Sequence, residues 1–512
     1  MSFLRNCLTV ACLVPLAVTG YAQSINNVVV DANPGDESET AITVAPKNPN
    51  HLMATWNDHS QGSHSQPGFA FSSDGGSTWS APGIVPTSTQ PGEEGGYDPS
   101  CAIDKSGREF YVFTNRNPSG YNDLGAIDIK YSTDDGQHWI PSGNPYQVGS
   151  ASISQDKPYM AVDNSGDSAD GRIYVTWTDF SGNGSRIRLA YSSDQGQQWA
   201  TTADFNGFAN NSGNIVQCAM PAVGPDGTVY VAWYSGSQNN PSGVGGLGNI
   251  EVSMSTNSGH TFDSQYSLPS FPSVYRYPIG SLEASSYHTI AVDPNTGYVY
   301  LAWIEDNNGI FEIYFSHTDS PRNYTSWTTP ILVTQPTSGS DFMPWLTVNS
   351  KGVISLIYYQ GNSNSVDVFS AQSFNGGQSF STQVVKVTSA SGNPSATDTS
   401  SDYIGVTSDG SGEVHALWTD FRSGTDAHIY SANFNQQPTV TLTNPTYIDA
   451  GGSGAYYLIN GSQSNSIQVD LGTSITLQAV PQKQRLGFRR LGLRQLFQSG
   501  SLLPNRQCKP IC

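Results

Sequence analysis

The sequence predicts an all-β fold, specifically a seven-bladed β-propeller followed by a short C-terminal β-rich segment. Three observations indicate this fold: a pair of strands recurs seven times, a turn motif recurs five times, and the composition suits strands joined by many turns. The 512 residues include 52 Gly, 26 Tyr and 10 Trp, whereas 12% are charged. Gly serves tight turns, and aromatic residues favour strands. Internal repetition of this kind is typical of propellers.

The recurring pair opens with a short apolar strand that often ends in Val-Asp. A Gly-containing turn and a second strand follow, and the second strand ends in an aromatic residue. β-branched and aromatic residues dominate these segments, as expected of strands. The seven second strands are expected at 52–56, 110–113, 173–177, 229–233, 299–303, 354–358 and 414–418. Seven such pairs predict seven blades.

The turn motif reads Ser-x-Asp-x-Gly-x-x-Trp and follows the third strand of a repeat. Copies start at 72, 132 and 192, and variants with Asn and Phe start at 255 and 373. The fifth repeat instead has Ser316 and a longer turn that ends at Trp327. Asp or Asn can accept hydrogen bonds from turn amides, and Gly adopts backbone angles that other residues resist. We therefore expect the motif itself to serve folding.

This motif resembles the Asp-box of the bacterial neuraminidase repeat families, of which sialidases are the best-known members. The resemblance covers residues 24–435 and implies a propeller whose active site lies on the face opposite the Asp-boxes. Sialidases of the family have six blades, so six is the alternative to seven. We expect residues 26–30 to supply the outer strand of the last blade and so to close the ring.

Three further segments flank this region. Residues 1–22 read as a cleaved signal peptide, with Arg5, an apolar run at 8–18 and small residues before Gln23. We therefore expect a secreted, periplasmic or cell-surface protein, and the apolar run is too short to span a bilayer. Residues 437–480 predict a small β-sandwich-like module, which could be incomplete. Residues 481–512 are basic: either a tail that could be disordered, or a frame-shifted end, which we favour.

The formal net charge of −19 argues against a nucleic acid partner, because phosphate contacts need Lys and Arg. Before position 481 the chain has 15 basic and 41 acidic residues. We expect an extracellular glycan or glycoconjugate as partner, and a monomer. No metal or other cofactor is predicted. Residues 163–170 carry oxygen ligands that could hold Ca²⁺, but a solvated turn is the favoured interpretation.

Acidic residues gather in the two sets of loops that a propeller places on the face opposite the turn motifs. Loops after the second strands contain the residues predicted as acid, base or sugar-binding groups: Asp58, Asp179, Glu305, Asp306 and Asp420. Loops that enter the first strands contain Glu37, Glu39, Asp98, Asp156, Lys157, Glu283, Asp341 and Asp402. Glu39 is predicted to bind substrate, and Trp345 to stack on a sugar. Convergent carboxylates suit glycoside hydrolysis, although each could merely cap a turn.

The sialidase resemblance implies a Tyr nucleophile and an Arg cluster that binds the sugar carboxylate. Tyr287 or Tyr403 is the candidate nucleophile, and Arg116, Arg276 and Arg422 are the candidate arginines. Residues 275–278 are similar to the sialidase (Phe/Tyr)-Arg-Ile-Pro motif. The leading hypothesis is an exported sialidase-like glycoside hydrolase. The alternative is a non-catalytic surface propeller that binds glycans or proteins.

Overall fold

The computed structural model describes most of the predicted propeller and several short segments outside it. Described are residues 16–20, 25–60, 65–87, 95–115, 126–142, 146–147, 155–180, 184–201, 208–210, 214–237, 244–336, 339–381, 384–397, 401–435, 438–442, 456–459, 462–463, 466–468, 476–480 and 491–492. Arg116, most of the predicted signal peptide and most of the basic C-terminal segment lie outside these ranges.

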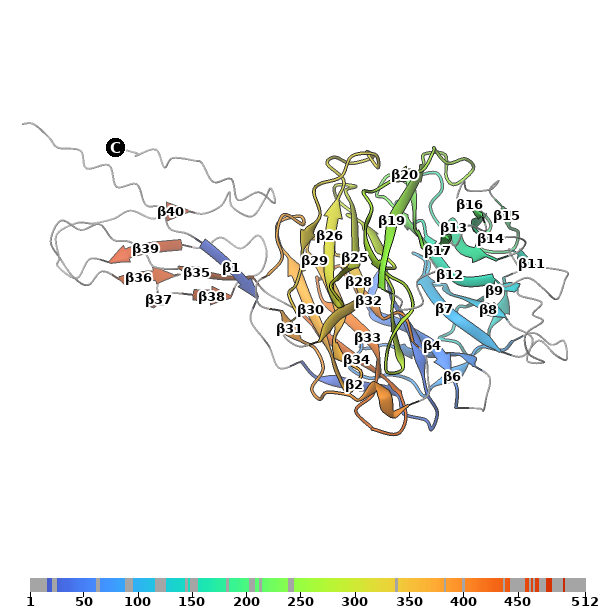
Figure 1. The fold of residues 1–512 in the computed structure, drawn as a ribbon, viewed down its shortest axis with the longest axis horizontal. Coiled ribbons are helices and arrows are strands. Elements are labelled where there is room, and N and C mark those ends of the chain that lie inside the picture. The colour runs from blue at the N-terminus through green and yellow to red at the C-terminus, as the bar shows by residue number, and fades with distance from the viewer. Residues whose placement is uncertain are drawn as a thin grey trace, which may run out of the picture.

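Seven four-stranded antiparallel sheets follow one another along the chain as the blades of a propeller (Figure 1). Blade 1 consists of β3 (Ser38–Ala45), β4 (Asn48–Asp58), β5 (Gln66–Ser72) and β6 (Gly83–Ile84). Blade 2 consists of β7 (Gly96–Ile103), β8 (Glu109–Asn115), β9 (Ala126–Ser132) and β10 (Ile140–Pro141). Blade 3 consists of β12 (Gln155–Val162), β13 (Ile173–Asp179), β14 (Gly184–Ser192) and β15 (Ala200–Thr201). Blade 4 consists of β17 (Asn214–Val223), β18 (Val229–Ser237), β19 (Val244–Ser255) and β20 (Tyr266–Ser267). Blade 5 consists of β24 (Thr289–Val292), β25 (Val299–Asn307), β26 (Ile310–His317) and β27 (Ile331–Leu332). Blade 6 consists of β28 (Ser340–Val348), β29 (Ile354–Asn362), β30 (Ser365–Ser373) and β31 (Val385–Lys386). The predicted seven-bladed fold is confirmed.

Blade 7 joins the two ends of the propeller. It consists of β32 (Gly405–Ser408), β33 (Val414–Asp420), β34 (His428–Phe434) and, as its outer strand, β2 (Asn27–Asp31) from the beginning of the chain. β2 pairs antiparallel with β34, with Asn27 opposite Ala432 and Val29 opposite Tyr430. The first strands contact one another around a closed ring, β3, β7, β12, β17, β24, β28, β32 and back to β3. The N-terminal segment therefore closes the ring, as the sequence predicts.

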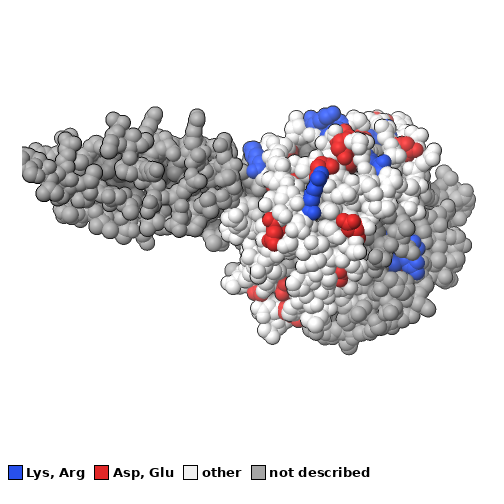
Figure 2. All heavy atoms as spheres, turned by 90° about the horizontal axis from the view of Figure 1, so that it is seen from above, with Lys and Arg blue, Asp and Glu red and all other residues white. Residues whose placement is uncertain are grey.

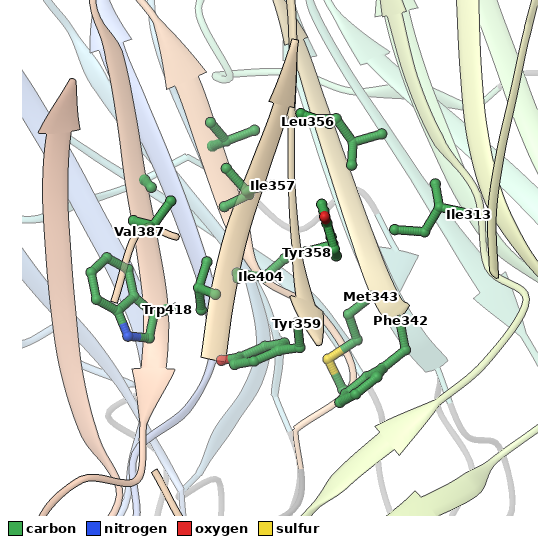
Figure 3. Packing of buried hydrophobic residues seen from close by; sticks show 14 of the residues in the cluster. Ile313, Phe342, Met343, Leu356, Ile357, Tyr358, Tyr359, Val387, Ile404 and Trp418 are labelled. Carbon is green, nitrogen blue, oxygen red and sulfur yellow. The ribbon is translucent and has the colours of Figure 1, made fainter. Parts of the chain in front are cut away.

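The aromatic residue of each second strand anchors the blade in the core. These seven side chains are at most 2% exposed: Trp56, Phe113, Trp177, Trp233, Trp303, Tyr358 and Trp418. Buried apolar side chains of neighbouring blades pack together in clusters. Figure 3 shows this at blade 6, where Ile357, Tyr358 and Tyr359 lie between Ile313 of blade 5 and Trp418 of blade 7. Burial of such large apolar side chains is the main stabilising contribution to a fold of this kind.

The turn motif forms the same hydrogen-bonded hairpin in blades 1, 2, 3, 4 and 6. In blade 1, the amide of Gly76 donates to Ser72 Oγ (2.8 Å), and the amide of Thr78 donates to Asp74 Oδ1 (2.8 Å). The motif aromatic then contacts the preceding blade: Trp79 Nε1 donates to Ser431 Oγ of blade 7 at 2.8 Å. Trp199 of blade 3 likewise donates to the Ser142 carbonyl (2.6 Å). The motif thus closes a hairpin and joins two blades.

Asp residues after the first strands cap the next hairpin. Asp104 Oδ1 accepts from the amides of Ser106 (2.8 Å) and Arg108 (3.0 Å), and Asp409 Oδ1 accepts from the amide of Ser411 (2.8 Å). Asp163 does the same at the start of the acidic turn 163–170. Within that turn, Asp170 pairs with Lys105 at 2.9 Å. The favoured interpretation of 163–170 as an ordinary turn agrees with these contacts.

Three additional strands extend blades 2, 3 and 4, and the other strands lie outside the blades. β11 (Tyr146–Gln147), β16 (Phe208–Asn210) and β21 (Phe271–Val274) pair with the third strands of blades 2, 3 and 4, and β22 (Tyr277–Ile279) pairs with β23 (Leu282–Ala284). One 3-10 helix covers Pro394–Ala396. The remaining strands are β1 (Leu16–Gly20), β35 (Pro438–Leu442), β36 (Tyr456–Ile459), β37 (Ser462–Gln463), β38 (Ser466–Gln468), β39 (Thr476–Val480) and β40 (Leu491–Gly492). Among the described residues, no helix has the length and apolar character needed to cross a membrane.

Candidate functional site at the first-strand entrance

A repeated distortion marks the point where the chain enters the first strands. Residues with positive φ stand there in five blades: Glu39 (55°), Asp98 (56°), Lys157 (50°), Cys218 (60°) and Met343 (51°). Each sits at a register shift between the first and second strands. Positive φ is uncommon for residues other than Gly, and bulges re-aim side chains. Because the turn motifs follow the third strands, these bulges lie at the opposite face of the propeller.

Three of these bulge residues and Asp402, which precedes β32, form a group of four charged side chains, here called the mouth cluster: Glu39, Asp98, Lys157 and Asp402. Lys157 Nζ lies 2.5 Å from Asp402 Oδ2, 3.5 Å from Asp98 Oδ1 and 3.9 Å from Glu39 Oε1. All four side chains are at most 12% exposed. Ion pairs in such surroundings are screened little by water. One ammonium group therefore faces three carboxyl groups from three other blades.

Glu39 is the carboxyl group of the mouth cluster whose surroundings favour its protonated form. Burial and the charge of Asp98 raise its pKa well above the usual range, a hydrogen bond to Asp402 acts in the same direction, and Lys157 opposes them. Burial lowers the pKa of Lys157, but the facing Asp402 and Glu39 raise it more, so its pKa stays well above its ordinary value. The surroundings thus favour the protonated form of Glu39 and the charged form of Lys157.

Ser401 positions two carboxyl groups beside Asp402. Its hydroxyl accepts from the backbone amide of Glu39 (3.1 Å), and its carbonyl accepts from the amide of Glu283 (2.8 Å). Glu283 also forms an ion pair with Arg276 at 2.9 Å. Burial, then the charge of Asp402, raises the pKa of Glu283, although Arg276 lowers it. Glu283 and Arg276 therefore form the rim of the mouth cluster, and the Arg276 side chain is 62% exposed.

Aromatic side chains form a wall next to the charged groups. The Trp345 ring lies 5.8 Å from that of Tyr159 and 6.0 Å from that of Tyr403. Tyr287 Oη donates to Gln217 Oε1 at 2.8 Å. Together with Asp402 these rings line a cavity of about 10 Å³, roughly the space of one water molecule. The cavity in this conformation is too small for a sugar ring.

The two tyrosines that the sialidase resemblance singles out both lie at this cavity. Burial raises the pKa of Tyr287 well above its usual range. Burial and the nearby acids Glu39 and Asp98 do the same for Tyr403, whose hydroxyl donates to the Pro99 carbonyl (3.3 Å). Both environments therefore favour the phenol over the phenolate.

The acids predicted after the second strands make contacts within their own blades. Trp303 Nε1 donates to Glu305 (3.0 Å) and Trp418 Nε1 to Asp420 (2.7 Å). These two acids therefore accept hydrogen bonds from buried indole groups. Asp306 Oδ1 accepts from the Gly309 amide (2.6 Å) in the β25–β26 turn.

Two further predicted acids lie elsewhere in blades 3 and 1. Asp179 accepts from Gln155 and from Arg188, each at 3.0 Å. Asp58 lies beside Asp31 and Glu37.

The two described arginines of the predicted cluster contact different residues. Arg276 pairs with Glu283 at the rim, whereas Arg422 pairs with Asp420 (2.7 Å) and donates to Asn27 (2.9 Å) in blade 7. Arg116 lies outside the described residues. The surface offers few other cations on the face shown in Figure 2, where acidic and basic side chains are sparse and scattered.

Three members of the mouth cluster, Asp98, Lys157 and Asp402, were predicted to lie in the loops that enter the first strands. None of them was predicted to be a catalytic or substrate-binding residue. A shared spacing in the sequence does mark most of the equivalent positions at the entrances of the first strands. Asp98, Lys157, Tyr287, Met343 and Tyr403 each stand six positions before the Asp or Asn that caps the next hairpin. The offset identifies equivalent positions in successive blades. It does not reveal which of them carry interacting charges, because those blades are far apart in the chain.

No family model matches the chain, and no curated protein matches it. The chain is similar to the α-L-arabinanase of Penicillium chrysogenum solved with arabinobiose, with 14% identity over 81% of this chain and 98% of that chain and a TM-score of 0.45. It is also similar to the leech intramolecular trans-sialidase solved with 2,7-anhydro-Neu5Ac, with 13% identity over 67% and 68% of the two chains and a TM-score of 0.45. A protein of unknown function from Dyadobacter fermentans has 15% identity over 80% and 98%, with a TM-score of 0.44. The fold assignment rests on the seven sheets of this chain itself.

Proposed function

We propose that this protein is an exported glycoside hydrolase, an Asp-box relative of the sialidases, that acts on extracellular glycans at the mouth cluster. The observation that carries the proposal is the buried Glu39 carboxyl group, whose pKa is raised, in one cluster with Lys157 and Asp402. Glycosidases need a carboxylic acid that stays protonated near neutral pH and donates that proton to the leaving oxygen. Glu39 has the environment that such an acid requires.

A second carboxylate is needed to attack the sugar or to activate water. Glu283 is our candidate, because the Ser401 backbone holds it next to Asp402 and its pKa is raised, as suits a general base. Lys157 would bind an anionic or hydroxyl group of the substrate, and Trp345 would stack on a sugar face. The acids after the second strands remain candidates for distant sugar contacts, with Glu305 half-buried and bonded to Trp303.

The sialidase version of the proposal needs at least two arginines at one pocket, because guanidinium groups bind the sugar carboxylate in bidentate fashion. Arg276 borders the mouth cluster through Glu283. Arg116 is the second candidate. Tyr403 would be the nucleophile, since it lies against Lys157, with the ammonium 5.5 Å from the ring centre.

The alternative function is a non-catalytic propeller that binds glycans. The cavity of about 10 Å³ favours it, because a reaction site must admit at least one sugar ring. Binding at the exposed Arg276 rim would not need the cavity to open.

A hydrolysis screen of the purified mature protein separates the two functions. The panel contains sialosides, arabinans and neutral and acidic polysaccharides, and sugar release is measured by chromatography with mass detection. Release from any member supports the hydrolase, and release from sialosides alone supports the sialidase version. Retention on a glycan array without release from the same glycan would contradict the hydrolase and establish the binding function.

A further inference from the structure

The point where the propeller ring closes holds three buried carboxyl groups. Asp31 ends β2, the N-terminal strand of blade 7, and Asp58 ends β4 of blade 1. Glu37 lies in the segment that passes from one blade to the other, where its backbone amide donates to the Ala427 carbonyl (2.9 Å). The three side chains are at most 1% exposed, and one oxygen from each lies within 4.8 Å of the others.

Donors of the protein satisfy only part of this cluster. Asp31 Oδ1 accepts from the Asn33 amide (2.8 Å), and Glu37 Oε2 accepts from the His59 amide (3.2 Å). Asp58 Oδ1 accepts from the amide (2.9 Å) and the hydroxyl (2.6 Å) of Ser60. Within the described part of the chain, the buried Glu37 Oε1 has no hydrogen-bond partner, whereas the Trp56 indole interacts with the Asp31 carboxyl group. An orphaned buried oxygen is unfavourable unless something binds it.

The charged neighbours of Glu37 are acidic, namely Asp58, Asp31 and Asp36. A bound cation would offset their mutual repulsion. In the mouth cluster, by contrast, Lys157 balances the carboxylates.

Three carboxyl oxygens at this spacing match a hard divalent cation. Ca²⁺ binds oxygen ligands at about 2.3–2.6 Å, so two ligands on opposite sides of the ion are about 5 Å apart. Carboxylates can bind it through one or both oxygens, which would use Asp31 Oδ2 and Glu37 Oε1. Mg²⁺ demands a stricter octahedral shell and gives up its water reluctantly, so a fully buried cage suits it less well.

We propose that Asp31, Glu37 and Asp58 bind one Ca²⁺ ion that holds the N-terminal strand in blade 7 and so locks the ring. The ion would connect the last residue of β2 to the last residue of β4. Its binding stabilises the closed propeller over the unfolded chain, since the three ligands come together only when the ring is closed. The role is structural and independent of glycan hydrolysis.

Calcium titration of the chelator-treated full chain tests the proposal. Isothermal calorimetry should show one Ca²⁺ bound per chain, and the midpoint of thermal unfolding should rise by several degrees between EDTA and 5 mM Ca²⁺. Absence of both binding and stabilisation overturns the proposal. An equal response to Mg²⁺ at the same concentration overturns the assignment to calcium.

Two matched variants locate the ion. Glu37→Gln keeps the size of the side chain, so it should fold, weaken calcium binding by about tenfold or more, and remove most of the thermal response. In EDTA it should be about as stable as the wild type, because Gln keeps the size and polarity of the side chain. Asp167→Asn alters the exposed acidic turn 163–170 and should leave the calcium response unchanged. A normal response in Glu37→Gln, or its loss in Asp167→Asn, would place the ion elsewhere.

Discussion

Glu39 illustrates how a single residue acquires its chemistry from neighbours that are distant in the sequence. Its backbone has a positive φ of 55°, and its amide is held by the hydroxyl of Ser401. Its carboxyl group faces Asp98 and Asp402, whose charges raise its pKa. Strained backbone of this kind is often found at functional sites. The raised pKa of Glu39 therefore depends on residues from three blades, because Asp98 belongs to blade 2 and Asp402 to blade 7.

The raised pKa of Glu39 predicts the pH dependence of hydrolysis. The proton donor is active while protonated, so kcat/KM should fall as pH rises through the Glu39 pKa, which lies well above the usual value of a carboxyl group. The pH–rate profile of kcat/KM on a substrate identified in the screen measures this. An alkaline limb centred near 4.5, the ordinary value for Glu, would show that Glu39 is not the acid.

Removing the ammonium of the mouth cluster should cost considerable stability. Lys157→Met leaves the buried carboxyl groups of Asp98 and Asp402 without a counter-charge, so the free energy of unfolding should fall by about 3–5 kcal/mol. Urea denaturation followed by tryptophan fluorescence measures the difference. The exposed Lys351→Met variant is the control, and equal stability of the two variants would contradict the ion pairing described for Lys157.

At the scale of single elements, strands and turn motifs were predictable because their causes are local. The second strands show β-branched and aromatic patterns, and the Ser, Asp and Gly of each turn motif make contacts within five residues. The bulges in the first strands were not predictable in the same way. Their residues include Glu, Asp, Lys, Cys and Met, which share no propensity for positive φ.

The turn motif offers a matched pair of substitutions. Gly76 has φ of +82°, and a Cβ there would lie 2.6 Å from Asn433 Oδ1 of blade 7. Gly75 has φ of +70°, but its nearest neighbour would be 3.6 Å away. Gly75→Ala should lower the free energy of unfolding by about 1 kcal/mol through backbone strain alone, and Gly76→Ala by about 2–3 kcal/mol. Equal losses in denaturant melts would show that the turn does not press against blade 7.

At the scale of the whole molecule, the closure of the ring was predictable from the sequence, whereas the contacts of the candidate catalytic residues were not. Closure of the ring by residues 26–30 was predictable, because the last repeat lacked an outer strand and β2 now fills that place. The choice of Asp179, Glu305 and Asp420 as catalytic groups remains a prediction. Their hydrogen bonds to a buried indole, or to Gln155 and Arg188 for Asp179, could not be predicted, because a carboxylate with a structural partner looks the same in sequence as a catalytic one.

The closing strand should contribute to global stability through one face. Val30 is 4% exposed and packs in the core of blades 1 and 7, whereas Val29 is 45% exposed. Val30→Ala should lower the free energy of unfolding by about 2 kcal/mol, and Val29→Ala should change it by less than about 0.5 kcal/mol. Thermal and urea unfolding measure both. If Val30→Ala matched Val29→Ala, β2 would not be part of the cooperative ring.

The measurement that tests the central claim most directly is the turnover of Glu39→Gln on the best substrate of the screen. The control is Asp263→Asn, an exposed carboxylate next to the turn motif of blade 4, on the opposite face. Because Gln cannot donate the proton, kcat should fall by about 10²–10⁴-fold, while the control retains wild-type activity. Wild-type kcat in a folded Glu39→Gln variant would contradict the proposal that the mouth cluster is the reaction site.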